Sequence, residues 1–446
     1  MKLFVTRAAA ASAALFLSLP GITALASPAE GDTLRLSLED IFSRIETENR
    51  TMTMLKTARE AAEEGVRDAE NARYPDVNAS VNVSYIGDAY IADRNLGNWT
   101  KAPSPHFGNG FTLDASQVVY AGGALDAAVK MAGLESEAAS VQIDKTREAL
   151  RLMAAGQYLD LYKVANSIRV YMENITLTEK LIDEIQAKRE AGVALANDVT
   201  RYELRLELLK LDLTRLRNTS EVLNYRICNM LDLPSGSVVV PQIEGEAHSG
   251  PSPESAQEWH DSAMNSSPEI RMSGINAEMA LTRHTLAKSG ILPKIAVVAH
   301  EGFDGPITFE LPPIDKNLNI WYVGVGLKYD LGALYKSKRK ISQAAVQSRQ
   351  ALEAKSVAEE NLRNDVQQAY LDWRQSFVEL ETRRKSLQLA EENYERVHDR
   401  YVEQLALTTD MLDAFNMKLD SELAVQDAEA EIIYRFARLE YVAGIL

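Results

Sequence analysis

The sequence is poor in cysteine and in histidine. Its 446 residues include one cysteine, Cys228, which excludes an intramolecular disulfide framework and a cysteine-rich metal site. The six histidines are scattered, with no pair spaced by four along a helix, so we expect no dedicated zinc site. The 23 glycines and 14 prolines are too few for a disordered or collagen-like chain. We therefore expect a chain that folds around apolar cores.

Basic charge is also scarce. The chain has 48 lysines and arginines against 64 aspartates and glutamates, a net charge of −16, which argues against a nucleic-acid binder. Motifs for catalysis are missing as well. The glycines in 108–110 and 324–326 are not followed by the helix start of a dinucleotide site, and there is no serine elbow or nucleophile–histidine arrangement. We predict that the protein is not an enzyme and has no catalytic, cofactor or metal site.

Long apolar runs are absent after residue 26, so no transmembrane helix is predicted. The first 26 residues have the pattern of a secretory signal that is removed. Lys2 and Arg7 form a basic start, 8–19 is a short apolar run, and 24–26 is an Ala-Leu-Ala cleavage site. A protein exported in this way is periplasmic, secreted, or inserted in an outer membrane as β-strands.

What the sequence does contain is an internal duplication. An offset of 218 places Pro75 on Pro293, and later an offset of 212 places Tyr-Leu-Asp at 158–160 on the same letters at 370–372. Two constant offsets that hold over long stretches predict two copies of one structural unit. The first copy is residues 27–232, the Pro/Gly-rich linker is 233–253, and the second copy is 254–446.

Each copy is predicted to be mostly helical. Apolar residues recur every seven positions in both copies, which is the pattern of a coiled-coil seam. This seam consists of Leu161, Ile168, Ile175 and Ile182, then Trp373, Leu380, Leu387 and Tyr394. The predicted helices are 37–48, 51–73, 125–190 and 198–231 in the first copy, and 255–265, 268–289, 333–402 and 409–442 in the second. A helix of about 65 residues is on the order of 100 Å long, far more than a globular helix.

Two segments of each copy alternate apolar and polar residues. The predicted strands are 77–86, 111–120, 294–301 and 321–330, and the segments 87–110 and 302–319 are expected to be loops. Tyrosine and tryptophan at the strand edges fit lipid-facing strands with a wet lumen. A small soluble sheet with one buried face has the same alternation. Taken alone, the alternation favours the soluble sheet.

Four strands cannot close a barrel, and open sheet edges are not tolerated in hydrocarbon. Membrane strands in this chain would therefore have to be shared among several chains. In each copy two shorter helices, placed end to end, approach the length of the long one and would form part of a cylinder wall. The sequence thus predicts a mostly helical α+β chain in a hollow oligomer, with a β-barrel in the outer membrane and a helical tube in the periplasm.

Two motifs add a resemblance to this pattern. The step from strand to long helix is Tyr-Ala-Gly-Gly at 120–123, and the second-half tip reads Asp-Met-Leu-Asp-Ala at 410–414, close to a D-V-L-D-A motif. Over essentially its whole length after the signal, the chain resembles the TolC-like outer-membrane efflux family. The resemblance implies a trimer whose twelve shared strands, four per chain, form one barrel that continues as a long α-helical periplasmic tunnel.

The resemblance also implies a function and partners. The trimer would sit in outer-membrane lipid and give passive exit to substrates. These would come from an inner-membrane efflux pump or a type I secretion system, through a periplasmic adaptor. No nucleic acid or cofactor is implied, and neither the substrate nor the particular pump is indicated by the residues.

Asp410 and Asp413 are the first candidate site residues. They are three apart on one helix face, at the turn between the long helix and its return. In a threefold assembly they would form two rings of carboxylates that attract cations. Spacing alone favours helix capping and dipole stabilisation instead. The resemblance assigns both residues to the constricted periplasmic entrance.

Tyr401 and Asp198 are the second pair. By resemblance they match a tyrosine and an aspartate whose hydrogen bond between hairpins holds the entrance shut. The companion arginine of the family falls on Ala406 here and its threonine partner on Asn197, so half of that latch is absent. A plain seam role for Tyr401 is an equally good interpretation.

Two other classes of protein are compatible with long helical hairpins. A periplasmic adaptor usually has one hairpin, flanked by Gly-rich segments and a membrane anchor, whereas this chain has two hairpins and no such flanks. A structural coiled-coil protein would leave the Tyr/Trp-edged strands unexplained.

Overall fold

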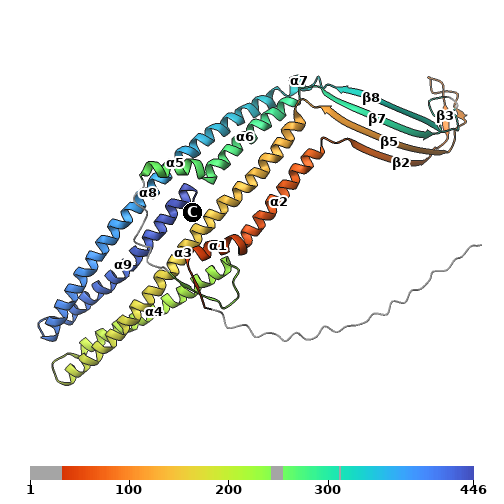
Figure 1. Cartoon of the computed structure of the whole chain (residues 1–446). Coiled ribbons are helices and arrows are strands. Elements are labelled where there is room, and N and C mark those ends of the chain that lie inside the picture. The colour runs from red at the N-terminus through yellow and green to blue at the C-terminus, as the bar shows by residue number, and fades with distance from the viewer. Residues whose placement is uncertain (1–32, 243–254, 311–312) are drawn as a thin grey trace, which may run out of the picture.

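The computed structural model describes residues 33–242, 255–310 and 313–446. The molecule is elongated, with a β-sheet at one end and two helical hairpin tips at the other (Figure 1). The predicted signal segment, 1–26, and residues 243–253 of the predicted linker lie outside the described residues. The prediction of a mostly helical α+β chain is confirmed.

The elements of each kind follow in chain order. The helices are α1 (Leu38–Glu48), α2 (Arg50–Asn71), α3 (Ala124–Glu190), α4 (Ala196–Met230), α5 (Ala256–Ser266), α6 (Pro268–Ser289), α7 (Ala333–Lys336), α8 (Lys338–Val402) and α9 (Thr408–Ala443). The strands are β1 (Thr33–Leu36), β2 (Asp76–Tyr85), β3 (Ala89–Ile91), β4 (Thr100–Ala102), β5 (Phe107–Tyr120), β6 (Val238–Pro241), β7 (Lys294–Gly305) and β8 (Leu318–Lys328).

The two long helices, α3 and α8, organise the two copies. In each copy the long helix packs against a returning helix at the tip and a shorter helix near the sheet: α4 and α2 beside α3, and α9 and α6 beside α8 (Figure 1). The end of α9 meets the start of α6. Gly444 closes α9 in the left-handed conformation, and a Cβ there would lie only 2.7 Å from the backbone of Ser267. Each pair of shorter helices thus runs the length of its long partner.

The long helix of the second copy begins with a small irregularity. Residues 333–402 were predicted as one helix, whereas α7 and α8 are separated at Ser337. Ser337 keeps right-handed helical dihedrals, and Ile341 N–H still donates to the Ser337 carbonyl at 2.9 Å. The interruption is therefore a local turn and not a bend in the chain direction.

One small sheet is not foreseen by the sequence pattern. β1 pairs in parallel with β6, which lies inside the segment expected to be linker. The two strands are held to α3 by Tyr158, whose hydroxyl bonds the Leu36 carbonyl at 2.9 Å and the Gln242 backbone at the same distance. The start of the linker is thus anchored on the first copy through Val239, which is buried.

The main sheet joins the two copies. Its strand order is β2-β5-β7-β8, antiparallel throughout, and the central pair β5–β7 brings one strand from each copy together. The strands extend further than the alternation predicts. Residues 108–110 and 302–305 were expected to be loop because of their glycines and polar residues, yet they pair across the ladder. Residues 89–91 and 100–102 also form a short hairpin, β3–β4, within a predicted loop.

Candidate functional site

The two hairpin tips begin their returning helices in the same way. In the first hairpin the Asp198 carboxylate accepts a hydrogen bond of 3.2 Å from the Leu195 N–H. In the second hairpin the Asp410 carboxylate accepts one of 3.2 Å from the Leu407 N–H. Both aspartates stand at the third position of their helix, where a carboxylate satisfies a free backbone donor and complements the helix dipole. Asp198 and Asp410 therefore have equivalent capping roles.

Asp413 has no such structural contact. It is exposed one turn beyond Asp410, and among the described residues it has no hydrogen-bond or ion-pair partner. Asp410 is exposed as well. The tip therefore presents two carboxylates to solvent. Asp410 also caps its helix, whereas Asp413 makes no such contact within the described ranges and adds only negative charge to the surface.

The tips are held together by buried side chains from both hairpins, which we call the tip cluster. The tip cluster consists of Leu181, Ile182, Ile185, Val199, Tyr202, Leu206 and Met411. Tyr401, near the end of α8, packs against it half-buried, and the Lys188 ammonium lies 5.1 Å above its ring. Burial raises the pKa of Tyr401, and a side-chain hydrogen bond with Thr408 opposes that rise.

The structure brings Tyr401 and Asp198 near each other without joining them. The charge of Asp198 contributes to the raised pKa of Tyr401, but no hydrogen bond links the two residues in the part of the chain that the structure describes. Thr408 is the partner of Tyr401 instead. Ala406 lies in the turn before α9 and Asn197 in the first turn of α4, and neither carries the positive charge that a family-like latch would use.

Sequence reasoning missed Tyr202 as a polar residue of this site. Its side chain is 1% exposed, and its hydroxyl has no hydrogen-bond partner among the described residues. Burial raises its pKa, and the neighbouring Tyr401 adds to the shift. A tyrosine at a seam position otherwise filled by leucine is the one sequence signal that could have revealed it.

The main sheet has two chemically different faces. Pairing across the four strands places alternate residues on one face, for example Val77, Ala115, Ala299 and Val323. Exposed apolar side chains dominate this face: Val77, Val81, Val83, Tyr85, Phe111, Leu113, Val297, Phe303, Trp321, Val323, Val325 and Leu327. We call it the apolar face. A carboxylate, Glu301, also stands there, bonded to the Asn319 amide.

The opposite face is polar. It includes Ser80 and Thr112, whose hydroxyls lie 2.7 Å apart, and a hydrogen bond of 2.7 Å between His300 Nδ1 and Asp114 Oδ1. The His300 ring stacks on Tyr322 with centroids 5.2 Å apart. We call it the polar face. A sheet that exposes both an apolar face and a polar face within one chain has no core of its own.

Comparisons at the level of sequence find no known family model and no curated protein that matches the chain. Solved structures do match. VceC, an outer membrane protein from Vibrio cholerae, is 14% identical with a TM-score of 0.76, over 91% of this chain and 96% of that one. CusC, a transmembrane channel protein, is 13% identical with a TM-score of 0.78, over 94% and 95%. The Campylobacter jejuni outer membrane channel CmeC is 13% identical with a TM-score of 0.74, over 91% and 85%.

This chain has the TolC-like channel fold. The resemblance drawn from the duplicated halves and the tip motif is thus confirmed at the level of the fold.

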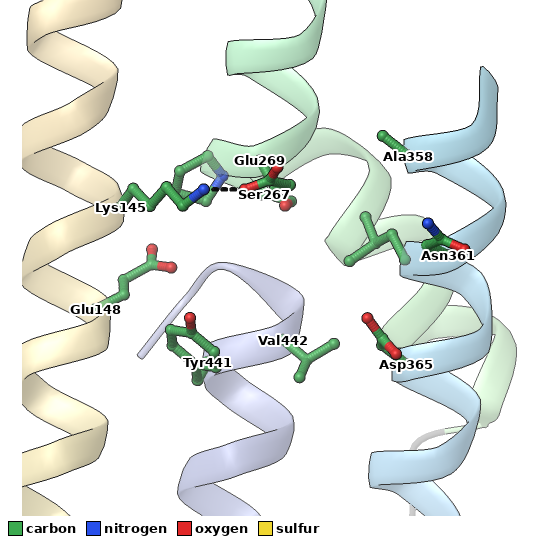
Figure 2. Close-up of a pocket in the computed structure, with 11 residues that line it drawn as sticks. Lys145, Glu148, Ser267, Glu269, Ala358, Asn361, Asp365, Tyr441 and Val442 are labelled. Carbon is green, nitrogen blue, oxygen red and sulfur yellow. Dashed lines mark hydrogen bonds and ion pairs between the residues drawn. The ribbon is translucent and has the colours of Figure 1, made fainter. Parts of the chain in front are cut away.

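In this channel fold a described cavity lies where the two copies meet. It holds about 360 Å³ between α3, α6, α8 and α9, at the junction of α9 with α6 (Figure 2). Lys145 and Glu269 form an ion pair on its wall. Glu148 points into the same space, and its burial, assisted by the nearby Asp144 charge, raises its pKa to about 7. The lining contains no histidine or cysteine.

Two further features bear on the chemistry available. Within the described ranges, no three histidine, cysteine, aspartate or glutamate side chains are grouped so that they could hold a metal ion. None of the helices in those ranges is both long enough and apolar enough to cross a lipid bilayer.

Proposed function

We propose that the protein is a trimeric outer-membrane channel that continues as a helical tunnel in the periplasm. It would give passive exit to substrates brought by an inner-membrane efflux pump or a type I secretion system through a periplasmic adaptor. It would perform no chemistry of its own. This proposal combines the geometry of the sheet with a fold shared by proteins described as outer-membrane channels.

One observation carries the proposal: the main sheet is unfinished within one chain. Every residue of β2 is exposed, and β2 and β8 each have one side on which no described strand pairs. Unpaired strand edges cannot remain open in a lipid bilayer, because each backbone group needs a partner there. Pairing β8 of one chain with β2 of the next would close the ring and satisfy both edges.

The apolar face supports a membrane setting. On β2 the outward residues from Val77 to Tyr85 extend roughly 26 Å at about 3.3 Å per residue. Tilted strands reduce this height to about 20 Å, comparable to the apolar band of about 25 Å on outer-membrane barrels. Tyr85 lies at one end of this band, where aromatic rings occupy the membrane interface.

The tips would form the periplasmic entrance. With threefold symmetry, Asp410 and Asp413 would make two rings of carboxylates, which attract cations to the opening. Tyr401, with Thr408 as its partner and Asp198 nearby, would close the contact between hairpins. Because the arginine of the family latch is absent, we propose that packing in the tip cluster carries more of the closure here.

Single-channel conductance in planar bilayers tests the entrance. We expect wild-type channels to be blocked by added multivalent cations. Asp413→Ala removes a charge without touching a cap, so it should raise the half-blocking concentration about tenfold, and the Asp410→Ala/Asp413→Ala pair by more. Asp420→Ala, an exposed carboxylate two turns further along α9, is the matched control and should block like wild type.

Cation block that is unchanged in the double variant would exclude the carboxylate rings while leaving the channel in place. Tyr401→Phe tests the closing contact separately. It should raise the resting conductance, whereas Tyr394→Phe, one heptad earlier on α8, should not. An absence of any conductance from purified wild-type protein in bilayers would contradict the channel itself.

A further inference from the structure

The polar face of the sheet contains a group of side chains that the channel function does not require. Its members come from three neighbouring strands and surround two glycines, Gly110 and Gly302. Asn82 on β2 and Asp304 on β7 flank Gly110 on β5. His300 and Asp304 stand two residues before and after Gly302 on the same face of β7.

The two glycines are there for space and not for backbone freedom. Neither has a positive φ, so an L-residue could adopt their backbone conformation. A Cβ on Gly302 would stand 2.9 Å from His300 Nε2 and 3.3 Å from Asp304 Oδ2. A Cβ on Gly110 would stand 2.2 Å from Asn82 Oδ1 and 2.6 Å from Asp304 Oδ1. Glycine within a strand often marks a close approach of this kind.

The atoms that converge there are all acceptors. The carboxylate of Asp114 accepts from His300 Nδ1 at 2.7 Å, so the ring proton is on Nδ1 and Nε2 carries a lone pair. Nε2 and the Asp304 carboxylate thus border the space over Gly302, and the same carboxylate and the Asn82 carbonyl oxygen border the space over Gly110. None of these three acceptors has a hydrogen-bond partner in the described ranges. Acceptors gathered in this way create a negative patch on the polar face that a cation would neutralise.

We propose that His300 Nε2, Asp304 and Asn82 bind a divalent transition-metal ion on the polar face of the sheet. Imidazole together with carboxylate and amide oxygens suits Zn²⁺, Ni²⁺ and Cu²⁺. Asp114 is the positioning residue, because a carboxylate on the other ring nitrogen orients a histidine ligand and increases its basicity. Three protein ligands leave the remaining coordination positions to water, so the ion is exchangeable and does not hold the fold together.

The location follows from the proposed function. If the polar face lines the barrel, each protomer places one such site on the pore wall. A metal ion that passes through the pore would bind this site strongly enough to occupy it and weakly enough to dissociate again, as ions do in a conducting pore.

Cu²⁺ titration of the untagged, detergent-purified protein tests the site, with electron paramagnetic resonance as the readout. We expect one copper per chain whose spectrum shows an imidazole nitrogen. His300→Asn should abolish this signal, and Asp114→Asn should weaken the apparent affinity about 10- to 100-fold. Gly302→Ala should also abolish it, although it removes no ligand, because the new methyl group occupies the ion's place.

Matched controls come from the same sheet and its loops. His106, which has a ring nitrogen near the Asp88 carboxylate but is not among the atoms nearest to a Cβ on Gly108, serves as His106→Asn. Gly324, on the polar face of β8 with open space around it, serves as Gly324→Ala. Both controls should bind copper like wild type. Circular dichroism and oligomer mobility on gels establish that each variant is folded.

The site is excluded if wild-type copper lacks a nitrogen ligand, if Gly302→Ala binds as wild type does, or if His106→Asn removes the signal. Conductance without copper separates this result from the proposed function. A conducting channel that lacks the copper signal would overturn the site alone. Copper bound through His300 in a protein that does not conduct would support the site and contradict the channel.

Discussion

The helical hairpins and the sheet differ in where their apolar side chains find partners. In the helices apolar side chains find their partners within one chain: Val141, Ile185 and Leu209 are almost completely buried. In the sheet the apolar side chains of β2 and β8 face outward and are exposed. Both regions contain the same kinds of apolar residues, so they differ in what surrounds these side chains. The helices carry their own core, whereas the sheet depends on surroundings that a single chain does not supply.

A charge placed on the apolar face of the sheet gives the strongest test of this difference between the helices and the sheet. Val325 on β8 is 73% exposed, and in a soluble monomer Val325→Lys would be harmless. If the face contacts lipid, lysine there should cost about 2–4 kcal/mol per chain, which is multiplied in an oligomer. We expect the detergent-resistant oligomer to be lost on gels.

Asn78→Lys is the control, because it adds the same charge to the polar face of β2. It should assemble as wild type does. If both variants assemble equally well, both faces of the sheet contact water. The apolar side chains of the sheet would then not depend on a lipid environment, which would contradict the contrast with the helices.

The second prediction concerns the core that the hairpins do possess. Met411 is fully buried in the tip cluster, so Met411→Ala should destabilise the packing of α9 against α3 and α4 by about 3 kcal/mol. Amide hydrogen exchange in the two tips should rise accordingly, with little change in the sheet. Met417→Ala, at a site that is 58% exposed, should leave exchange unchanged. Unchanged exchange in Met411→Ala would show that the hairpins are independent at their tips.

A third, smaller effect separates capping from charge. Asp198→Ala and Asp410→Ala each remove a hydrogen bond to a backbone N–H and a favourable interaction with the helix dipole. Each should therefore destabilise the first turn of its helix by about 0.5–1 kcal/mol. Asp413→Ala should not. Hydrogen exchange in the first turns of α4 and α9 measures this, and similar losses in all three variants would contradict the distinction.

The smallest effect is the pH dependence of the cavity between the copies. The pKa of Glu148 is raised from 4.5 to about 7 when the chain folds, so the folded state holds its proton more tightly than the unfolded state. The stability that this contributes is present at low pH and is lost as the pH rises through 7. Glu148→Gln should melt like wild type at pH 5 and about 1–2 °C higher at pH 8, since solvent screening reduces the penalty.

The exposed Glu137→Gln on the same helix is the control for a simple loss of charge. The difference between its melting temperature and that of wild type should be the same at pH 5 and at pH 8. A Glu148→Gln variant that gains stability at pH 5 but not at pH 8 would reverse the assigned sign.

Periodicity predicted the regular elements because their signals are local. The seven-residue seam and the alternating strands each repeat over many residues, and Leu161 and Leu380 are indeed buried. β6 escaped prediction because its pairing partner, β1, lies about 200 residues away and its own four residues carry no distinctive pattern. The glycines within 108–110 have a loop-like composition for a similar reason: their ladder pairing with Asn82 and Ser84 is a non-local contact.

For the candidate site residues, the repeat accounts for where they stand on the hairpins but not for their contacts. The offset of 212 places Asp198 and Asp410 in equivalent caps, which spacing on its own favoured. The hydrogen bond of Tyr401 to Thr408, in place of Asp198, depends on how the turn after α8 folds. The unpartnered hydroxyl of Tyr202 depends on packing between two hairpins far apart in sequence. Neither is encoded in a local pattern.

Native mass spectrometry of the protein released from detergent tests the central idea most directly, namely that strands are pooled among identical chains. The account predicts a single species with the mass of three chains, which falls apart or precipitates when amphiphile is withdrawn. A monodisperse monomer that stays in solution in plain buffer would contradict it.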